Sequence, residues 1–249
     1  MTGVHGTAAG YFAAMRAEYD SLIRRAVPSY DAMTTELVDC LPRRAARVLE
    51  LGCGTGNFSL RLADRFPNAT LTVVDASPEM VGVTRTRLRS SHPDVEGHAR
   101  FVAARFEALR AGRVQFDLVT SCISLHHLAE VDHVFHVIHG VLRPGGTFRF
   151  ADQMRGGTPG NHDRNWRRWL EFCRQPGHCS PEELQSLLDH SDAHDHYRTL
   201  RDHIASLEAA GFSSVDCTWR DGMWAIVTAD VRAERPGRAR HRSLERHRA

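Results

Sequence analysis

The 249-residue sequence contains no lysine, so its 32 basic side chains other than histidine are all arginine. A chain without lysine cannot use a Schiff base, a P-loop lysine or a lysine general base. It has no apolar run of about 18 residues, so the sequence predicts no membrane-spanning helix. Its first residues lack the pattern of a secretory signal, and its six cysteines form no CxxC pair. We therefore expect a cytoplasmic protein with free thiols and no membrane partner.

The composition, 42% hydrophobic and 25% charged, is typical of one globular domain, which we place at residues 1–230. The formal net charge of +2 is unevenly distributed along the chain. Segment 231–249 holds seven Arg and two Glu, a net +5, so the remainder carries −3. Few apolar residues accompany these charges, and we predict a basic, disordered tail.

Apolar residues recur at helical spacing in the N-terminal region, 1–42, with an interruption near Pro28. Short apolar runs and helical patterns then alternate, which predicts a parallel sheet with helices on both faces. A polar, His-rich stretch follows, and we interpret 153–197 as a helical lid inserted after the fifth strand. Asp221-Gly222 separates the last two expected strands and predicts an antiparallel hairpin. The expected strands are 47–51, 70–75, 100–104, 116–121, 147–151, 214–219 and 224–228; the expected helices are 57–66, 77–89, 131–142 and 200–210, with two more around 166–172 and 181–188.

The most informative stretch is VLELGCGTGN at 48–57, in which a buried strand enters a glycine-rich turn that opens a helix. Gly52, Gly54 and Gly56 let the backbone approach a ligand closely, and the helix N-terminus offers N–H donors. Asp75 ends the next strand, where its carboxylate can accept hydrogen bonds from both hydroxyls of a ribose. Glu50 precedes the first glycine and can accept from a ligand ammonium. The GxGxG spacing differs from GxGxxG and argues against a nicotinamide dinucleotide.

Five sequence blocks, in order, resemble those of the class I S-adenosylmethionine-dependent methyltransferases. The blocks are VLELGCGTGNFS, VVDASPEM, FDLVTSCISLHHL, VLRPGGTFRFAD and LEAAGFSSVDCTWRDGMWAIVTA. The resemblance covers about residues 30–228 and implies S-adenosylmethionine as the cofactor. It also implies an α/β fold: a Rossmann-like, seven-stranded, mostly parallel sheet with a C-terminal antiparallel hairpin, to which this chain adds N-terminal helices and the lid.

The resemblance implies roles for residues along the cofactor. Asp75 would bind the ribose, and Ala76 and Met80 would flank the adenine. The residues implied to wrap the methionine part are Gly52, Cys53, Gly54, Thr55 and Gly56, and those implied to line the pocket at the fourth strand are Ser121, Cys122 and Ile123.

Two further positions near the cofactor follow from the resemblance. The segment RRAVPSY resembles one in some members, including carboxy-S-adenosylmethionine synthases, whose tyrosine contacts the cofactor, so Tyr30 is a candidate. Packing at a helix start is the alternative for Tyr30. The family commonly places an acidic and a small residue where this chain has Arg105-Phe106. Arg105 cannot accept from the adenine amino group, so a backbone carbonyl or Glu107 would do so, whereas Phe106 could stack on the ring.

Methyl transfer from a sulfonium mainly requires an aligned nucleophile and the exclusion of water, so we predict no metal. A base is needed when the acceptor is protonated. His126 and His127, after the fourth strand, and Asp152, after the fifth, are candidates; purely structural roles in the loops are the alternative. The run that contains His190, His194 and His196 lacks a recognised metal-ligand spacing. Trp166, Trp169 and Phe172 recur at helical spacing and either cover a substrate or pack onto the sheet.

The predicted function is therefore transfer of the sulfonium methyl group to a nucleophilic O or N of a small molecule. The arginine-only composition is typical of a GC-rich genome, and it suggests a role in bacterial specialised metabolism. Two alternatives stay open: a related enzyme of non-methylating chemistry (cyclisation or carboxy-S-adenosylmethionine formation), and an RNA-modifying methyltransferase that uses the basic tail. We expect a small-molecule acceptor, no nucleic-acid partner, and a monomer or homodimer.

Overall fold

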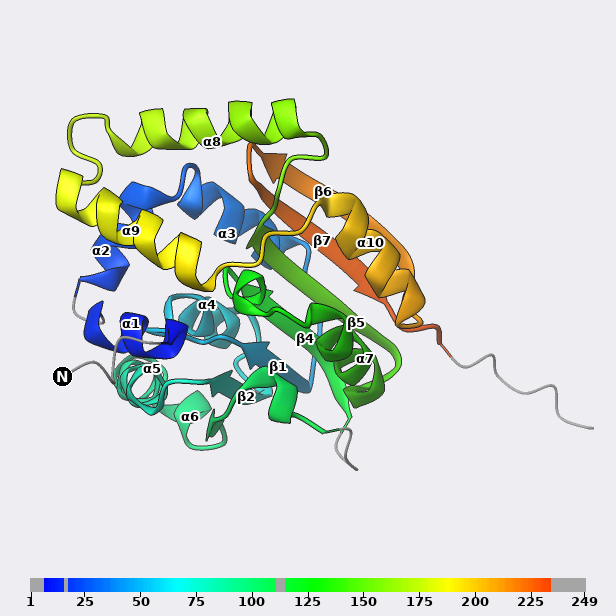
Figure 1. Cartoon of the computed structure of the whole chain (residues 1–249). Helices are drawn as coiled ribbons and strands as arrows, with labels where there is room; N and C mark the ends of the chain where they lie inside the picture. The colour runs from blue at the N-terminus through cyan, green and yellow to red at the C-terminus, as the bar shows by residue number, and fades with distance from the viewer. Residues whose placement is uncertain (1–6, 16–17, 111–114, 234–249) are drawn as a thin grey trace, which may run out of the picture.

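A computed structural model of the chain describes residues 7–15, 18–110 and 115–233. Seven strands within these residues form one sheet in the order β3-β2-β1-β4-β5-β7-β6 (Figure 1). Neighbouring strands from β3 to β5 run parallel, and β7 is antiparallel to both β5 and β6. The α/β fold and its C-terminal hairpin are thus confirmed. The strands are β1 (Arg47–Leu51), β2 (Thr70–Asp75), β3 (Arg100–Ala103), β4 (Phe116–Cys122), β5 (Leu142–Gln153), β6 (Ser213–Asp221) and β7 (Trp224–Asp230).

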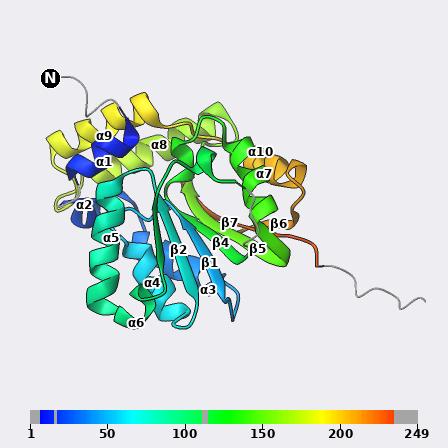
Figure 2. The same cartoon turned by 90° about the horizontal axis from the view of Figure 1, so that it is seen from below.

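Helices cover both faces of the sheet (Figure 2). On one face lie α3 (Tyr30–Asp39), α4 (Asn57–Arg65) and α5 (Pro78–Ser91); on the other lie α7 (Val131–Val141) and α10 (Leu200–Ala209). Ser77 begins α5 as predicted, because its hydroxyl accepts from the Met80 amide and Pro78 occupies the first turn.

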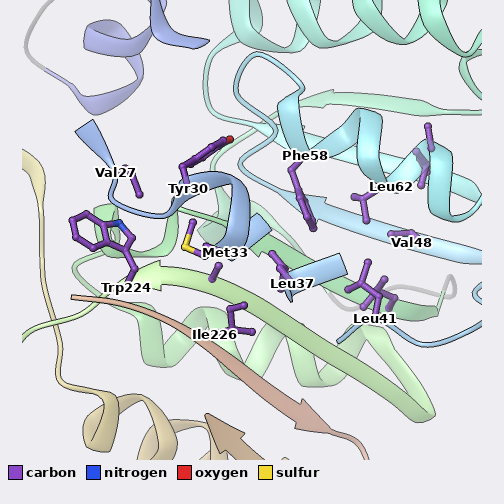
Figure 3. Packing of buried hydrophobic residues seen from close by; sticks show 14 of the residues in the cluster. Val27, Tyr30, Met33, Leu37, Leu41, Val48, Phe58, Leu62, Trp224 and Ile226 are labelled. Carbon is purple, nitrogen blue, oxygen red and sulfur yellow. The ribbon is translucent and has the colours of Figure 1, made fainter. Parts of the chain in front are cut away.

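Two apolar clusters bury the faces of the sheet. Met33 and Leu37 of α3 are fully buried in the same cluster as Ile226 of β7 (Figure 3). On the other face, Phe148 and Phe150 of β5 stack with ring centroids 5.0 Å apart and adjoin Phe135 of α7. Packing on both faces explains why the central strands read as continuous apolar runs in the sequence.

Four further helices gather over one end of the sheet (Figure 2). They are α1 (Ala8–Met15), α2 (Tyr19–Ala26), α8 (Pro159–Cys173) and α9 (Pro181–His194). The predicted lid is helical, and a capping box of Ser180 and Glu183 starts α9. Arg25 of α2 holds the lid through two hydrogen bonds to Glu183, at 2.7 and 2.8 Å. The indole Nε1 of Trp169 donates to the carbonyl oxygen of Ala26 at 2.8 Å, so this buried tryptophan packs the lid onto α2.

Strand β5 is longer than predicted and begins at Leu142. The residues Pro144-Gly145-Gly146, between the expected helix 131–142 and strand 147–151, are typical of a break between two elements. Instead, Gly145 donates to Val231 and Gly146 accepts from it, so backbone pairing with this residue, which directly follows β7, keeps the segment extended. Three short helices were not predicted, because three or four residues show no helical period. They are α6 (Pro93–Glu96), η1 (Phe106–Ala108) and η2 (Leu125–His127).

No helix in the described part of the chain has the length and apolar character needed to cross a membrane. The predicted disordered tail falls outside the described residues from position 234 onward.

Candidate active site

The glycine-rich turn lies between β1 and α4, at the point where strand order reverses around β1. In open α/β sheets this switch point, outside the carboxyl ends of the strands, is the usual ligand site. Gly52 and Gly56 adopt φ angles of 77° and 89°, a region that other residues rarely enter. A Cβ atom on Gly52 would lie 2.3 Å from the hydroxyl oxygen of Ser124. The turn therefore needs glycine at position 52 for its conformation and for space.

Asp75 at the end of β2 faces the glycine turn. Its Oδ2 accepts from the Gly54 amide and its Oδ1 from the Ser77 amide, both at 2.9 Å. Burial raises the pKa of Asp75, and these backbone amides oppose the shift. Because each carboxylate oxygen accepts only one of these bonds, both retain a lone pair for ligand hydroxyls.

Asp20 of α2 braces the far side of the same turn. Its carboxylate accepts hydrogen bonds from the Thr55 hydroxyl at 2.5 Å, from the side-chain amide of Asn57 at 2.9 Å and from the Arg87 guanidinium at 2.8 Å. Arg87 also donates to the Thr55 carbonyl oxygen at 2.9 Å. The sequence offered no signal for Asp20, because its partners lie at least 35 residues away along the chain.

A cavity of about 620 Å³ opens above the turn. Most of the predicted cofactor residues line it, and so does one predicted catalytic residue. These are Tyr30, Gly52, Cys53, Gly54, Thr55, Asp75, Ala76, Met80, Arg105, Phe106, Cys122 and His127. The sequence analysis did not place Tyr19 of α2, Ser124, the segment 128–130, or the lid residues Ala193, His194 and His196 at this cavity, which they also line; it considered His194 and His196 only as metal ligands.

Three predicted cofactor residues, Glu50, Gly56 and Ser121, do not line the cavity. Glu50 is 1% exposed, and its Oε2 accepts from the Ser59 hydroxyl at 2.5 Å. Burial raises the pKa of Glu50 to about 7, against the effect of that hydrogen bond. Ser121 donates to the Leu51 carbonyl oxygen at 3.0 Å beneath the turn. The structure thus places Glu50 and Ser121 as supports for the loop.

In the unusual pair Arg105-Phe106, the arginine side chain is exposed to solvent and the phenylalanine side chain is buried. Arg105 is exposed at the cavity rim, where its guanidinium lies 3.5 Å from Glu107 Oε1. Phe106 is buried, and its ring lies 3.4 Å from the position of a Cβ on Gly52. Phe106 therefore forms part of the apolar wall beside the turn, and Glu107 also lines the cavity.

A second, smaller chamber of about 80 Å³ adjoins the first. Tyr19, Ile123 and His127 line both spaces, so the large cavity and the chamber adjoin at these three residues. Ile123 has a φ of 54°, which is strained for a β-branched residue and costs about 1–3 kcal/mol. Such strain is concentrated at functional sites, and here it lies where β4 ends between the two spaces.

The chamber walls are mainly aromatic and aliphatic, with Trp169 and Trp224 among them. Two buried donors in these walls, Gln153 Nε2 and Trp224 Nε1, have no hydrogen-bond partner among the described residues. A buried donor left without an acceptor costs about 1–3 kcal/mol, so a ligand that supplies an oxygen would relieve this cost.

The predicted catalytic residues meet at this chamber. The Nδ1 atom of His126 lies 2.5 Å from Asp152 Oδ1, and the His126 backbone amide donates to Asp152 Oδ2 at 3.0 Å. His126 lines the chamber, whereas Asp152 lies behind it. Burial lowers the pKa of His126, but Asp152 and Asp195 outweigh it and raise the value to about 8. Burial and the neighbouring His126 lower the pKa of His127.

Asp195, at the end of the lid, completes this group although the sequence analysis did not make it a catalytic candidate. Its Oδ1 lies 2.8 Å from His127 Nδ1, and Tyr197 donates to its Oδ2 at 2.5 Å. The His-rich run of the lid does not converge on one point. His190 lies 3.7 Å from Asp195, whereas His194 and His196 line the large cavity.

Comparisons with known proteins agree with this architecture. A family model described as a methyltransferase domain matches residues 48–146. The carboxy-S-adenosyl-L-methionine synthase of Chromohalobacter salexigens is 31% identical over 81% of this chain and 75% of its own length. The trans-aconitate 2-methyltransferase of Streptomyces avermitilis is 31% identical over 69% of this chain, and the chain spans 59% of that protein.

Solved structures share the fold at lower identity. The [4+2]-cyclase SpnF superposes with a TM-score of 0.64 at 15% identity, covering 93% of this chain and 98% of its own. This likeness concerns the fold alone. The family-model match and the two relatives, together with the glycine turn and Asp75, lead to one conclusion: the chain belongs to the class I S-adenosylmethionine-dependent methyltransferases, enzymes whose cofactor is S-adenosylmethionine.

Proposed function

We propose that this enzyme transfers a methyl group to a nucleophilic O or N of a small molecule that enters the chamber beside the cofactor cavity. The observation that carries the proposal is the shared wall of Tyr19, Ile123 and His127 between the two spaces. A nucleophile in the chamber and a cofactor in the cavity would meet at this wall. Methyl transfer mainly requires that the nucleophile be aligned with the methyl group of the cofactor and that water be excluded.

The large cavity fits S-adenosylmethionine. Its volume of about 620 Å³ lies within the range of small-molecule sites, about 300–1,000 Å³. We propose that Asp75 accepts the ribose hydroxyls, that the turn from Gly52 to Gly56 surrounds the methionine part, and that Met80 contacts the adenine. When bound, S-adenosylmethionine supplies a methyl group already activated by its positively charged sulfur. The chain's own task is then to align the acceptor and exclude water.

The chamber favours an acceptor that carries an oxygen next to its nucleophile. Gln153 and Trp224 each present a donor that lacks a partner among the described residues, and an acceptor carboxylate, carbonyl or hydroxyl oxygen would satisfy them. The indole faces of Trp169 and Trp224 would exclude water from the reacting atoms. Where the acceptor carries a proton, we propose that the group of His126, His127 and Asp152 handles it. The arginine-only composition is typical of a GC-rich genome, and on that basis we extend the proposal to a role in bacterial specialised metabolism in the cytoplasm.

The test is an assay of S-adenosylhomocysteine release with a library of small hydroxy, carboxylic and amino compounds, read by mass spectrometry. We expect S-adenosylhomocysteine and a methylated acceptor in equal amounts. An Asp75→Ala variant should lose the signal, whereas an Asp64→Ala variant keeps it, because Asp64 is 72% exposed and pairs with His92. Release of methylthioadenosine in place of S-adenosylhomocysteine would contradict methyl transfer.

A second candidate function is formation of carboxy-S-adenosylmethionine. Two observations favour it: the 31% identical synthase, and the position of Tyr30 on the cavity wall. The same mass spectra distinguish the two functions. A carboxylated form of the cofactor, with its carboxyl group taken from a carboxylic compound of the library and with no S-adenosylhomocysteine, would support the second candidate and exclude the first.

A further inference from the structure

Three potential metal ligands meet beside the chamber. One ligand atom from each of His126, His127 and Asp195 lies within 4.8 Å of the other two. His126 and His127 belong to η2 after β4, and Asp195 follows α9 of the lid. The backbone amide of His196 donates to the His126 carbonyl oxygen at 2.7 Å. This bond joins the two segments that supply the ligands.

The spacing of these atoms suits a tetrahedral ion. Zinc bonds to nitrogen and oxygen of about 2.0–2.1 Å place neighbouring ligand atoms about 3.3 Å apart. The Asp195 Oδ1 atom lies 3.8 Å from His126 Nε2 and 2.8 Å from His127 Nδ1, so the observed distances bracket that value. A cation would take the place of the hydrogen bond between His127 Nδ1 and Asp195 Oδ1.

Two of the three ligands, His126 and Asp195, also have a hydrogen-bond partner that orients them. The Nδ1 atom of His126 bonds to Asp152, which leaves Nε2 directed at Asp195. Asp152 is held in turn by the amides of His126 and Gln153, at 3.0 and 2.8 Å. Tyr197 donates to the Oδ2 atom of Asp195 and leaves Oδ1 facing the imidazoles. A carboxylate behind a metal-binding histidine is the usual outer arrangement of zinc sites.

We propose that His126, His127 and Asp195 bind one divalent first-row transition ion, of which Zn²⁺ is the representative. Two imidazoles and one carboxylate favour such an ion over Mg²⁺ or Ca²⁺, which prefer oxygen ligands. Three protein ligands leave a fourth position, as in catalytic zinc sites, and all three residues also line the chamber.

The site deepens the proposed function, on which its chemical role rests. With the ion bound, both ring nitrogens of His126 are occupied, so in place of transfer to the histidines an acceptor oxygen in the fourth position would lose its proton to solvent, because the cation stabilises the oxyanion. The O–CH₃ bond then forms as the S–CH₃ bond breaks, and the electron pair of that bond stays on sulfur. Metal binding itself does not depend on this role.

The test uses the full-length protein, stripped with a chelator and then titrated with Co²⁺ and, separately, Zn²⁺. We expect one equivalent of tightly held metal by elemental analysis, and the strong visible bands of tetrahedral Co²⁺. His126→Ala and Asp195→Asn should weaken binding at least tenfold. Asp152→Asn should weaken it by about 10–100-fold through loss of the orienting partner. His136→Ala is the matched control, because His136 is an exposed imidazole on α7.

Folding of every variant is checked by thermal unfolding and by calorimetric affinity for S-adenosylhomocysteine, which should stay within twofold of wild type. Absence of a bound equivalent in wild type, or equal binding by the His126 and Asp195 variants, would overturn the proposal. Methyl transfer by a protein shown to be metal-free would overturn the catalytic role of the ion alone. Stoichiometric metal without any methylated product would count against the proposed function and leave the site intact.

Discussion

The imidazole of His126 and the carboxylate of Asp152 meet from adjacent parallel strands, with Nδ1 and Oδ1 2.5 Å apart and both side chains at most 7% exposed. Asp152 is the penultimate residue of β5, and His126 follows β4. Because parallel strands end at the same edge of a sheet, two distant segments deliver a buried acid and a buried base to one point. The lid adds Asp195 on the other side of His126.

Replacement of Gly52 tests the geometry of the glycine turn. Gly52→Ala should abolish measurable S-adenosylhomocysteine binding, because the new Cβ would lie 2.3 Å from Ser124 Oγ in a backbone region hostile to alanine. We also expect a loss of about 1–3 kcal/mol in unfolding free energy. Calorimetry and urea unfolding measure the two effects. Gly157→Ala, which meets no atom within 4 Å, should change neither.

Asp75→Ala tests the ribose contact. A hydrogen bond to a charged group contributes about 1.5–3 kcal/mol, so loss of the carboxylate should weaken S-adenosylhomocysteine binding at least tenfold. Isothermal calorimetry measures this, with Asp64→Ala as the exposed control. An affinity within threefold of wild type would remove Asp75 from the cofactor site.

Glu50 should make the folded state less stable as pH rises. Its pKa is about 7 in the folded protein against 4.5 ordinarily, so the folded state holds the proton longer than the unfolded chain. Unfolding then becomes easier between pH 4.5 and 7, by an amount on the order of 3 kcal/mol at most. Glu50→Gln should remove this fall, and urea unfolding across pH 4–8 measures it. If the unfolding free energies of wild type and variant changed with pH in the same way, Glu50 would not have a raised pKa. Glu36→Gln is the control, because Glu36 is exposed.

The Arg25–Glu183 pair should hold the lid. A double-mutant cycle with Arg25→Ala and Glu183→Ala should give a coupling of about 1 kcal/mol, as expected for a bidentate pair whose side chains are 28% and 32% exposed. Arg25 lowers the pKa of Glu183 to about 2. The contribution is therefore present above pH 4.5 and is lost as pH falls toward 2. Additive single-variant effects at pH 7 would show that the lid does not depend on this pair.

Gln153→Met should separate acceptor recognition from cofactor binding. The variant removes a buried donor of the chamber with little change in volume, so the KM for an oxygen-bearing acceptor should rise at least fivefold. Affinity for S-adenosylhomocysteine should stay within twofold, because Gln153 does not line the cofactor cavity. A change in cofactor affinity with an unchanged acceptor KM would place the acceptor elsewhere.

Much of the fold was predictable because local patterns agree with it. The runs 47–51 and 70–75 match β1 and β2, since strands buried on both faces read as apolar segments. The start of β5 was not predictable, because pairing of Gly145 and Gly146 with Val231 overrides the local signals of proline and glycine. For the site, the turn and Asp75 follow from spacing along adjacent elements. The supporting position of Glu50, by contrast, depends on Ser59 of α4.

By itself the sequence determined the alternation of strands and helices, the glycine turn and the carboxylate at the end of β2, because these depend on neighbours within about 20 residues. Only the tertiary structure decided which histidines act together. His126 and His127 meet Asp195 across about 68 residues, while His194 and His196 of the same lid turn to the other cavity. Side-chain direction at the end of a docked helix depends on packing against the sheet, and no spacing along the chain records it.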